Sequence, residues 1–445
     1  MSYISRYGRR PNEYASKSSH TYIINDEKVK SYLNTCDLPK EASEVELDKN
    51  LIYDIEYPQQ NPIEHFIAID GGYTTVAVKK SFPSSTISFF QFGALFFKLK
   101  DLEDIDIKPF IAPEDIARLK ELERIKLVIP TKNISLKGSS TLIYSVRKTI
   151  YDFFSADREG YNYIDTLKWF LFQEYNKTLS SYQLANCPEC GTPRIDIKYG
   201  DIRENHTFDC PLCKREIFLT DAFRLHEAID NELGAGGILG YLVNLIEQFL
   251  IIHTIKIILD LQPSVLKKTF FIKDGPLAFF GQTANMHKSM RHLCNYLFDK
   301  YDLCIAGLEK SGIFVEHADE ISEKLKPGQY LLLSNEYIYK HILPGDPDTN
   351  EPYARTSYYG SKLIFKSKDK KMYVATLPTA NEKVVLSPTK DKFKNIDIIL
   401  MNVEKLRCDM YDNSLFPIAL ANKLVSLSDH PSSMILEKFA KESVH

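Results

Sequence analysis

The sequence lacks any long hydrophobic stretch that is free of charged residues. The longest apolar run, residues 239–261, contains Glu247, Lys256 and Asp260, so it predicts a buried helix and not a membrane span. The N-terminus has no apolar signal region, because Arg6 and Arg9 lie there among polar residues. We therefore expect a cytoplasmic protein that has no contact with a membrane.

The sequence also lacks an excess of charge of one sign. Its formal net charge is −3 over 445 residues, so any surface that binds nucleic acid must be local. No Gly-x-x-x-x-Gly-Lys-Ser/Thr motif is present, which excludes a nucleotide-binding loop of that type. A step driven by ATP must therefore come from a partner.

Cysteine is sparse, and half of it lies in two Cys-x-x-Cys pairs. Cys187 and Cys190 precede Cys210 and Cys213, with nineteen residues between the pairs. Two such pairs at this spacing predict a tetrahedral zinc ribbon. Four cysteines leave no open coordination position, so this zinc is expected to be structural. The other four cysteines are scattered, which fits a reducing compartment and no disulfide framework.

Two carboxylates follow short apolar runs that read as buried strands. Asp274 follows Thr269–Ile272 and precedes Gly-Pro, and Asp70 follows Phe66–Ile69 and precedes Gly-Gly. Ligands of open α/β sheets bind at strand ends, and a divalent metal ion needs several carboxylate oxygens. Taken singly, each Asp-Gly is equally explained as a turn.

A third acid, Glu247, lies on the apolar stripe of the long helix predicted before Asp274. An unpaired glutamate there would be costly, so it must reach solvent, pair with a cation or bind a metal. His253 on the same helix is expected to be a packed core residue. After the next strand, Leu303–Leu308, a turn presents Lys310 at the same edge of the sheet.

These patterns predict an α/β fold with a ribonuclease-H-like mixed sheet flanked by helices and an inserted four-cysteine zinc ribbon. His65–Lys79 reads as a hairpin that turns at Asp70-Gly71-Gly72, and Thr86–Leu99 as a third antiparallel strand. Alternation of strand, helix and strand after residue 269 supports a mixed sheet. Helices are also predicted over Pro113–Leu122 and Asp165–Tyr175. The predicted segments are an N-terminal extension for partner contact at 1–60, the first part of the core at 61–100, an insertion at 101–234 with the ribbon at about 183–218, and the rest of the core at 235–445.

The sequence resembles the NurA nuclease family over roughly residues 63–435, apart from the insertion. The motifs that carry the resemblance are IAIDGG around Asp70, the acid-bearing helix at Glu247, IKDGPL around Asp274, GLEKSG at Lys310, YYGSK at Tyr358 and FPIALANK at the C-terminus.

The resemblance implies a nuclease that cuts DNA with Mn²⁺ or Mg²⁺, works as a dimer and partners a HerA-like hexameric ATPase. Such pairs are associated with DNA-end processing or defence against phage. Asp70, Glu247 and Asp274 would hold the metal ions, and Lys310 would stabilise charge on the scissile phosphate.

Several assignments stay open. The family has a histidine where this chain has Asn422, and His430 is a candidate to replace it. Glu227 is an alternative to Glu247 as the helix acid. Tyr358 is a weaker candidate for the site. A second hypothesis is a non-catalytic module on a ribonuclease-H-like core that binds nucleic acid or handles a guide strand. In that case the zinc ribbon would make the recognition.

Overall fold

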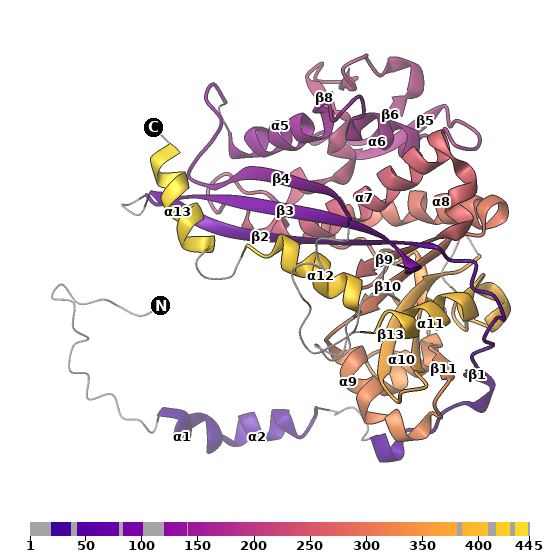
Figure 1. Cartoon of the computed structure of the whole chain (residues 1–445). Coiled ribbons are helices and arrows are strands. Elements are labelled where there is room, and N and C mark those ends of the chain that lie inside the picture. Colours follow the sequence, from indigo (N-terminus) through magenta and orange to yellow (C-terminus); the bar gives the residue numbers. More distant parts are fainter. Residues whose placement is uncertain are drawn as a thin grey trace. The chain divides into compact units, whose positions relative to one another are not determined.

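The computed structural model contains a nine-stranded mixed sheet with helices on both faces, which confirms the predicted α/β class (Figure 1). Clustering of contacts separates two units, Met1–Val45 and Glu46–His445, and the sheet lies in the second. The structure describes residues 19–36, 42–79, 83–100, 120–139, 141–380, 385–407, 415–427 and 432–443.

The centre of the sheet has ribonuclease-H-like strand order. Strands β2 (His65–Lys79), β3 (Ser85–Lys98) and β4 (Lys120–Lys132) form an antiparallel series. On the other side of β2 lie β9 (Thr269–Asp274) and β10 (Cys304–Glu309), both parallel to it. The resulting order is β4-β3-β2-β9-β10, in which β2 lies between an antiparallel and a parallel neighbour.

Beyond β10 the sheet continues with antiparallel strands. β13 (Met372–Pro378) pairs with β10, and β12 (Gly360–Lys366) forms an antiparallel hairpin with β13. β11 (Gln329–Leu332) and β1 (Ile52–Asp54) complete this edge.

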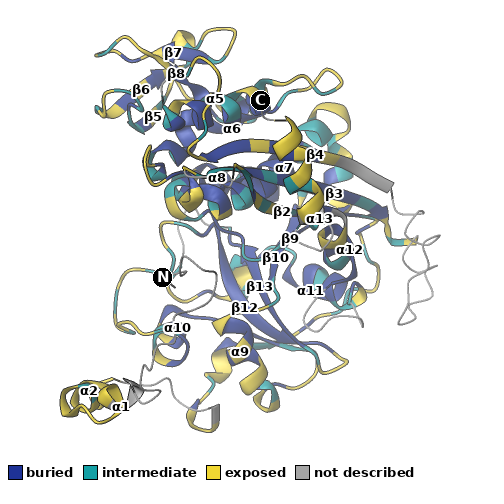
Figure 2. Cartoon of the chain, turned by 90° about the vertical axis from the view of Figure 1, so that its left-hand side faces the viewer, coloured by how far each residue is buried: buried dark blue, intermediate teal, exposed yellow. Residues whose placement is uncertain are grey.

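Helices cover the two faces of the sheet and bury its strands, which are mostly dark blue in Figure 2. On one face, the core contains α5 (Leu142–Ser155), α6 (Tyr163–Leu171), α7 (Leu239–Leu261) and α8 (Met286–Tyr301). The opposite face packs against α11 (Ile396–Lys405) and α12 (Phe416–Val425). The other described helices are α1 (Ser19–Ile24), α2 (Glu27–Leu33), α9 (Ile313–Glu320), α10 (Asn335–His341) and α13 (Ser432–Ser443).

The long helix α7 is a core helix. The segment Gly236–Leu261 is long and apolar enough to cross a membrane by length and composition, but 61% of its apolar window is buried inside the protein. A helix that is apolar on most sides is expected in a core, between a sheet and further helices. Its contacts with β2 and α6 agree with the predicted buried helix.

The predicted hairpin at Asp70-Gly71-Gly72 is wrong, because β2 runs through these residues without turning. Asp70 pairs with Gly93 and Gly72 with Gln91 in one antiparallel register with β3. Neither Gly71 nor Gly72 has a positive φ, so both have ordinary extended backbone. The long partner strand β3 overrides the local turn chemistry of Asp-Gly-Gly.

Two strands of the sheet lie in segments that the sequence analysis places outside the core. Lys120–Lys132 forms β4, so the helix predicted over Pro113–Leu122 is wrong at its end, and its first seven residues lie outside the described residues. The predicted insertion at 101–234 thus contains a strand of the core. Likewise, β1 joins the sheet from within the predicted extension at 1–60, because its Ile52 pairs with Leu331.

Candidate functional site

The structure brings Asp70 and Asp274 to neighbouring positions at the centre of the sheet. β2 and β9 are parallel, and their last paired residues are Ile69 and Lys273. Each aspartate therefore lies one position beyond the end of this pairing. β9 stops there, and Gly275 turns the chain with a φ of +81°. Asp274 thus lies at the carboxyl end of β9, where ligands bind in α/β sheets, and Asp70 of the longer strand β2 lies beside it.

Asp70 is a buried carboxyl group with one oxygen unsatisfied. Its side chain is 3% exposed, and Oδ1 accepts a hydrogen bond from the Gly71 backbone at 2.8 Å. Oδ2 is buried and has no hydrogen-bond partner among the protein atoms. Burial raises the pKa of Asp70 to about 6, with a further contribution from the charge of Asp274, while Lys310 and hydrogen bonding from Asn422 oppose the rise.

Glu247 reaches the same site from α7. It is 5% exposed, and its Oε2 lies 2.9 Å from the ammonium nitrogen of Lys273. Burial raises the pKa of Glu247 to about 7, Lys273 opposes this rise, and the charges of Asp70 and Asp274 add to it. The three acids are therefore electrostatically coupled in the metal-free protein.

Lys310 also lies at this site, as the sequence predicts. Its Nζ donates to Asp274 Oδ2 at 2.7 Å, and both side chains are partly exposed. Asn422 on α12 is an exposed residue whose amide lowers the pKa of Asp70. His430, the alternative candidate, lies outside the described residues.

The weaker candidates have other partners. Glu227 accepts hydrogen bonds from Arg224 at 2.7 and 2.9 Å and from Asn186 at 3.1 Å, and it does not contribute to the pKa shifts of Asp70 or Glu247. Tyr358 is buried beside Lys362, whose Nζ lies 5.1 Å from the tyrosine ring centre. Burial raises the pKa of Tyr358, so its hydroxyl stays protonated.

Lys273 is the residue of the site that the sequence analysis missed. It follows four fully buried residues of β9, Thr269–Ile272, and precedes the partly exposed Asp274. A charged residue in such a run needs a partner of opposite sign, and that requirement was the available signal.

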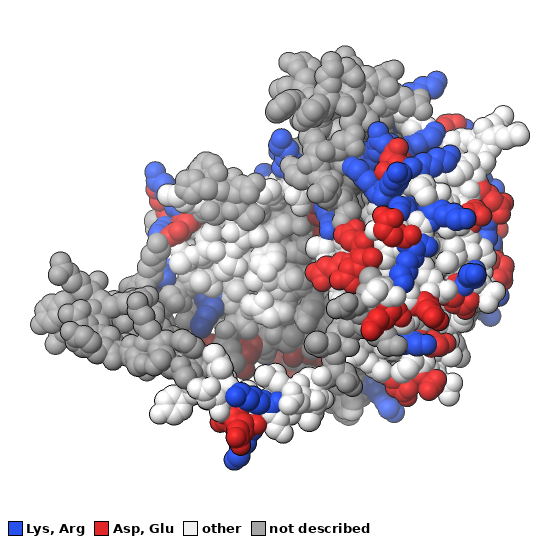
Figure 3. All heavy atoms as spheres, turned by 90° about the horizontal axis from the view of Figure 1, so that it is seen from below, with Lys and Arg blue, Asp and Glu red and all other residues white. Residues whose placement is uncertain are grey.

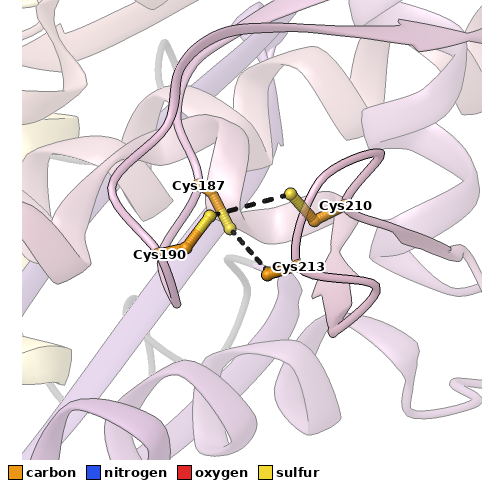
Figure 4. Close-up of side chains that lie close together, drawn as sticks. All are labelled: Cys187, Cys190, Cys210 and Cys213. Atoms are coloured by element: carbon orange, nitrogen blue, oxygen red, sulfur yellow. Dashed lines mark hydrogen bonds between the residues drawn. The ribbon is translucent and has the colours of Figure 1, made fainter.

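The four cysteines of the predicted ribbon converge on one point (Figure 4). Their sulfur atoms all lie within 4.8 Å of one another, and the Cys187–Cys213 and Cys190–Cys210 separations are each 3.9 Å. Four sulfurs at 2.3 Å from a tetrahedrally bound zinc ion would be about 3.8 Å apart. Among the residues that the structure describes, this is the group whose donor atoms are already close enough to hold a metal ion.

Each cysteine pair lies at the tip of a short hairpin. The first hairpin consists of β5 (Ser181–Asn186) and β6 (Pro193–Lys198), and the second of β7 (Thr207–Asp209) and β8 (Glu216–Phe218). The residue after the second cysteine of each pair, Gly191 or Lys214, has a positive φ. Its backbone N–H donates a hydrogen bond to the backbone carbonyl oxygen of the first cysteine. The two tips therefore have the same local geometry, which points both pairs of thiols inward.

Buried ion pairs connect the ribbon to α5. Arg147 is 3% exposed and donates two hydrogen bonds of 2.8 Å to Asp221. It also contacts Glu189, which lies between the first two cysteines and pairs with Arg215 at 3.0 Å. The cysteine cluster is thus fixed to the helical layer and not only to its own hairpins.

Charges of both signs are interspersed on the described surface seen from below in Figure 3. Within the ribbon, Ser181–Phe218, five Lys or Arg residues stand beside six Asp or Glu residues. Attraction of a polyanion must therefore come from local groups and not from a field of the whole molecule.

Comparisons with known proteins do not assign the chain to a family. No protein-family model matches it, and no curated protein matches it. Among solved structures, it matches the crystal structure of the NurA nuclease from Sulfolobus solfataricus over 95% of this chain and 91% of that chain. The TM-score is 0.34 and the sequence identity is 9%, a similarity too low to support a functional argument.

The cysteine cluster predicts one tightly bound zinc ion per chain. Changing Cys210 to Ser should abolish zinc binding and unfold the ribbon, because small metal domains take much of their folding free energy from the metal. Elemental analysis of the purified protein measures the zinc content. Changing Cys36, an exposed cysteine outside the cluster, to Ser should leave one zinc per chain. A Cys210→Ser protein with full zinc content would contradict the site.

The buried acids predict that the metal-free protein loses stability as the pH rises. Because the pKa of Asp70 is about 6, above its ordinary value of 3.8, the native state keeps a proton that the unfolded state loses. This contribution to stability is present at low pH and is lost as the pH rises from about 4 through the folded pKa.

The Asp70→Asn variant cannot titrate at this position. The free energy of unfolding of this variant minus that of wild type should therefore increase by on the order of 2–3 kcal/mol between pH 4 and pH 7. Denaturant unfolding of protein dialysed free of Mn²⁺ and Mg²⁺ measures this difference. An equal difference at both pH values would show that Asp70 ionises normally.

Proposed function

We propose that this protein is a metal-dependent DNA nuclease that hydrolyses phosphodiester bonds with Asp70, Glu247 and Asp274 as its metal-binding acids. The observation that carries the proposal is the position of Asp70 and Asp274 just beyond the last paired residues of the parallel strands β2 and β9, with Glu247 reaching the same place from α7. A single Asp-Gly corner is explained as a turn. Three coupled, largely buried carboxylates are not.

The donor set suits Mn²⁺ or Mg²⁺. Both ions prefer hard oxygen ligands, and carboxylates are the usual protein ligands for them. Asp70 Oδ2 is buried without a protein partner, and the charge of Asp274 makes ionisation of Asp70 more costly. A divalent cation would relieve both costs, since it supplies the ligand and the opposite charge.

Each residue then has a chemical role in hydrolysis. When bound, the metal supplies an activated water and stabilises the leaving 3′-oxygen. Asp70, Asp274 and Glu247 hold it on the rim of the sheet. Lys310, at the end of β10, is close enough to bind Asp274 and would place its positive charge beside the scissile phosphate.

The alternative, a non-catalytic module that recognises nucleic acid through its zinc ribbon, has less support. The ribbon carries no excess of positive charge, and its Arg203 and Arg215 are engaged by Asp209 and Glu189. We propose instead that its metal is a structural zinc ion.

The proposed partners are DNA, a second copy of the chain and a HerA-like hexameric ATPase, in the cytoplasm. The sequence resemblance supports this set, and the absence of a P-loop motif requires that any ATP-driven movement of DNA comes from another protein. DNA-end processing and defence against phage are the two biological settings that such a pair fits.

Loss of either Asp70 or Asp274 should abolish cleavage. Changing Asp70 or Asp274 to Ala should lower the cleavage rate by more than about 100-fold, the upper end of what loss of an outer-sphere partner of a metal costs. DNA binding should persist, because the change removes a negative charge that repels phosphate. Cleavage of labelled DNA in Mn²⁺, per folded molecule by circular dichroism, measures the effect on single- and double-stranded, linear and circular substrates.

Asp54 provides the matched control. It is a strand carboxylate on β1, an edge strand separated from β9 by four other strands, where it accepts a hydrogen bond from Gln329. The Asp54→Ala protein should cleave at the wild-type rate. Wild-type cleavage by a folded Asp274→Ala protein would end the nuclease proposal.

The N-terminal unit is the proposed contact with the ATPase. α2 is capped by Asp26, yet it has no buried residue, and large apolar side chains of the unit are exposed, among them Tyr22, Tyr32 and Leu33. Short helices that bury nothing gain little stability alone, so a partner surface is expected. Deleting residues 1–44, which spares β1, should abolish co-purification with the ATPase and leave the melting temperature of the core unchanged.

A point variant separates this contact from an effect of truncation. Changing Tyr32 and Leu33 to Ser alters only exposed side chains and should weaken the complex in the full-length chain. A complex of unchanged affinity after both changes would place the interface elsewhere.

A further inference from the structure

Lys273 lies between two of the acids, on a strand that is otherwise buried and apolar. Its side chain is 3% exposed, and its Nζ lies 2.9 Å from Glu247 Oε2. The same Nζ donates to the backbone carbonyl of Asp274 at 2.6 Å. One ammonium group therefore connects the acid of α7 to the end of β9.

The two oxygens of Glu247 have different surroundings. Oε2 is held by Lys273, whereas Oε1 is directed toward the backbone of Gly71, next to Asp70. A side chain at Gly71 would place its Cβ 3.3 Å from Oε1 and 2.5 Å from the ring of Phe92. The missing side chain leaves the space through which Glu247 approaches the strand that carries Asp70.

The structure contains a second buried pair for comparison. Lys362 on β12 is ion-paired with Glu309 at the end of β10, and both side chains are largely buried. Lys362 also lies 4.2 Å from the ring centre of Phe314, so its surroundings are those of a packed core lysine. Its ion-pair partner is Glu309 and none of the three acids Asp70, Glu247 and Asp274. A buried lysine pair alone is therefore compatible with a purely structural role.

We propose that Lys273 is a positioning residue for the metal site: it fixes Glu247 through Oε2 so that Oε1 is presented to a divalent cation held with Asp70 and Asp274. The proposal rests on the nuclease function proposed above. Outer-sphere partners orient metal ligands in this way, and their loss typically lowers metal affinity by about 10- to 100-fold.

Binding of Mn²⁺ alone tests the role of Lys273 without relying on cleavage. Isothermal titration of the full-length protein would compare wild type with Lys273→Met, Glu247→Gln and the double variant. Each single change should weaken Mn²⁺ binding by at least about tenfold. The double variant should bind no more weakly than Glu247→Gln, because Lys273 acts only through Glu247.

Two further variants distinguish positioning from general destabilisation. Lys362→Met removes an equally buried lysine from an ion pair, so it should lower the melting temperature and leave Mn²⁺ affinity unchanged. Lys273→Arg keeps the charge and donors and should recover part of the affinity that Lys273→Met loses. It also serves as the test if the Met variant does not fold.

The possible results are separable. Wild-type Mn²⁺ affinity in Lys273→Met, multiplied losses in the double variant, or an equal loss in Lys362→Met would each overturn the role of Lys273. Failure of wild type to bind Mn²⁺ would overturn this role and the nuclease proposal together. Wild type that binds Mn²⁺ and shows the expected coupling but cuts no DNA would refute only the nuclease proposal.

Discussion

The parallel pairing of β2 with β9 is the constraint on which the candidate site depends. These strands come from distant parts of the chain, and their pairing ends at Ile69 and Lys273, so the aspartates that follow are adjacent. A parallel pair needs a crossover, and here α7 crosses one face of the sheet before β9 and brings Glu247 with it. The connection that makes the sheet possible thus also delivers the third acid.

This geometry creates an imbalance of charge. Asp70, Glu247 and Asp274 lie close enough to influence one another, and among the described residues Lys273 and Lys310 supply opposite charges nearby. Burying a carboxylate away from water is unfavourable unless good partners replace the lost hydration. The pKa values of Asp70 and Glu247 are raised, so ionisation of these buried acids stays unfavourable despite the two lysines. Binding a cation would make their ionised form more favourable.

Features that depend on local chemistry could be predicted from the sequence, whereas those that depend on tertiary pairing could not. The strand that stops at Asp274 and the cysteine spacing follow from runs of a few residues. The predicted turn at Gly71 was wrong because β3 pairs with β2 on both sides of this residue. The helix predicted over Pro113–Leu122 was wrong at its end because Lys120–Leu122 belongs to β4, which pairs with β3. The partner of Lys273 lies on another element, and no local pattern reveals it.

The cysteine cluster and the acids are linked through the helical layer. Arg147 of α5 contacts Glu189 of the ribbon, and Phe154 of the same helix lies 4.9 Å, between ring centres, from Phe249 of α7. Phe249 lies two residues after Glu247. Closely packed interiors transmit strain, so unfolding of the ribbon would alter the packing of α5 against α7. The position of Glu247 relative to Asp70 would then change as well. On the proposed function, a structural zinc ion in the ribbon would therefore affect how the three acids come together, although it takes no part in hydrolysis.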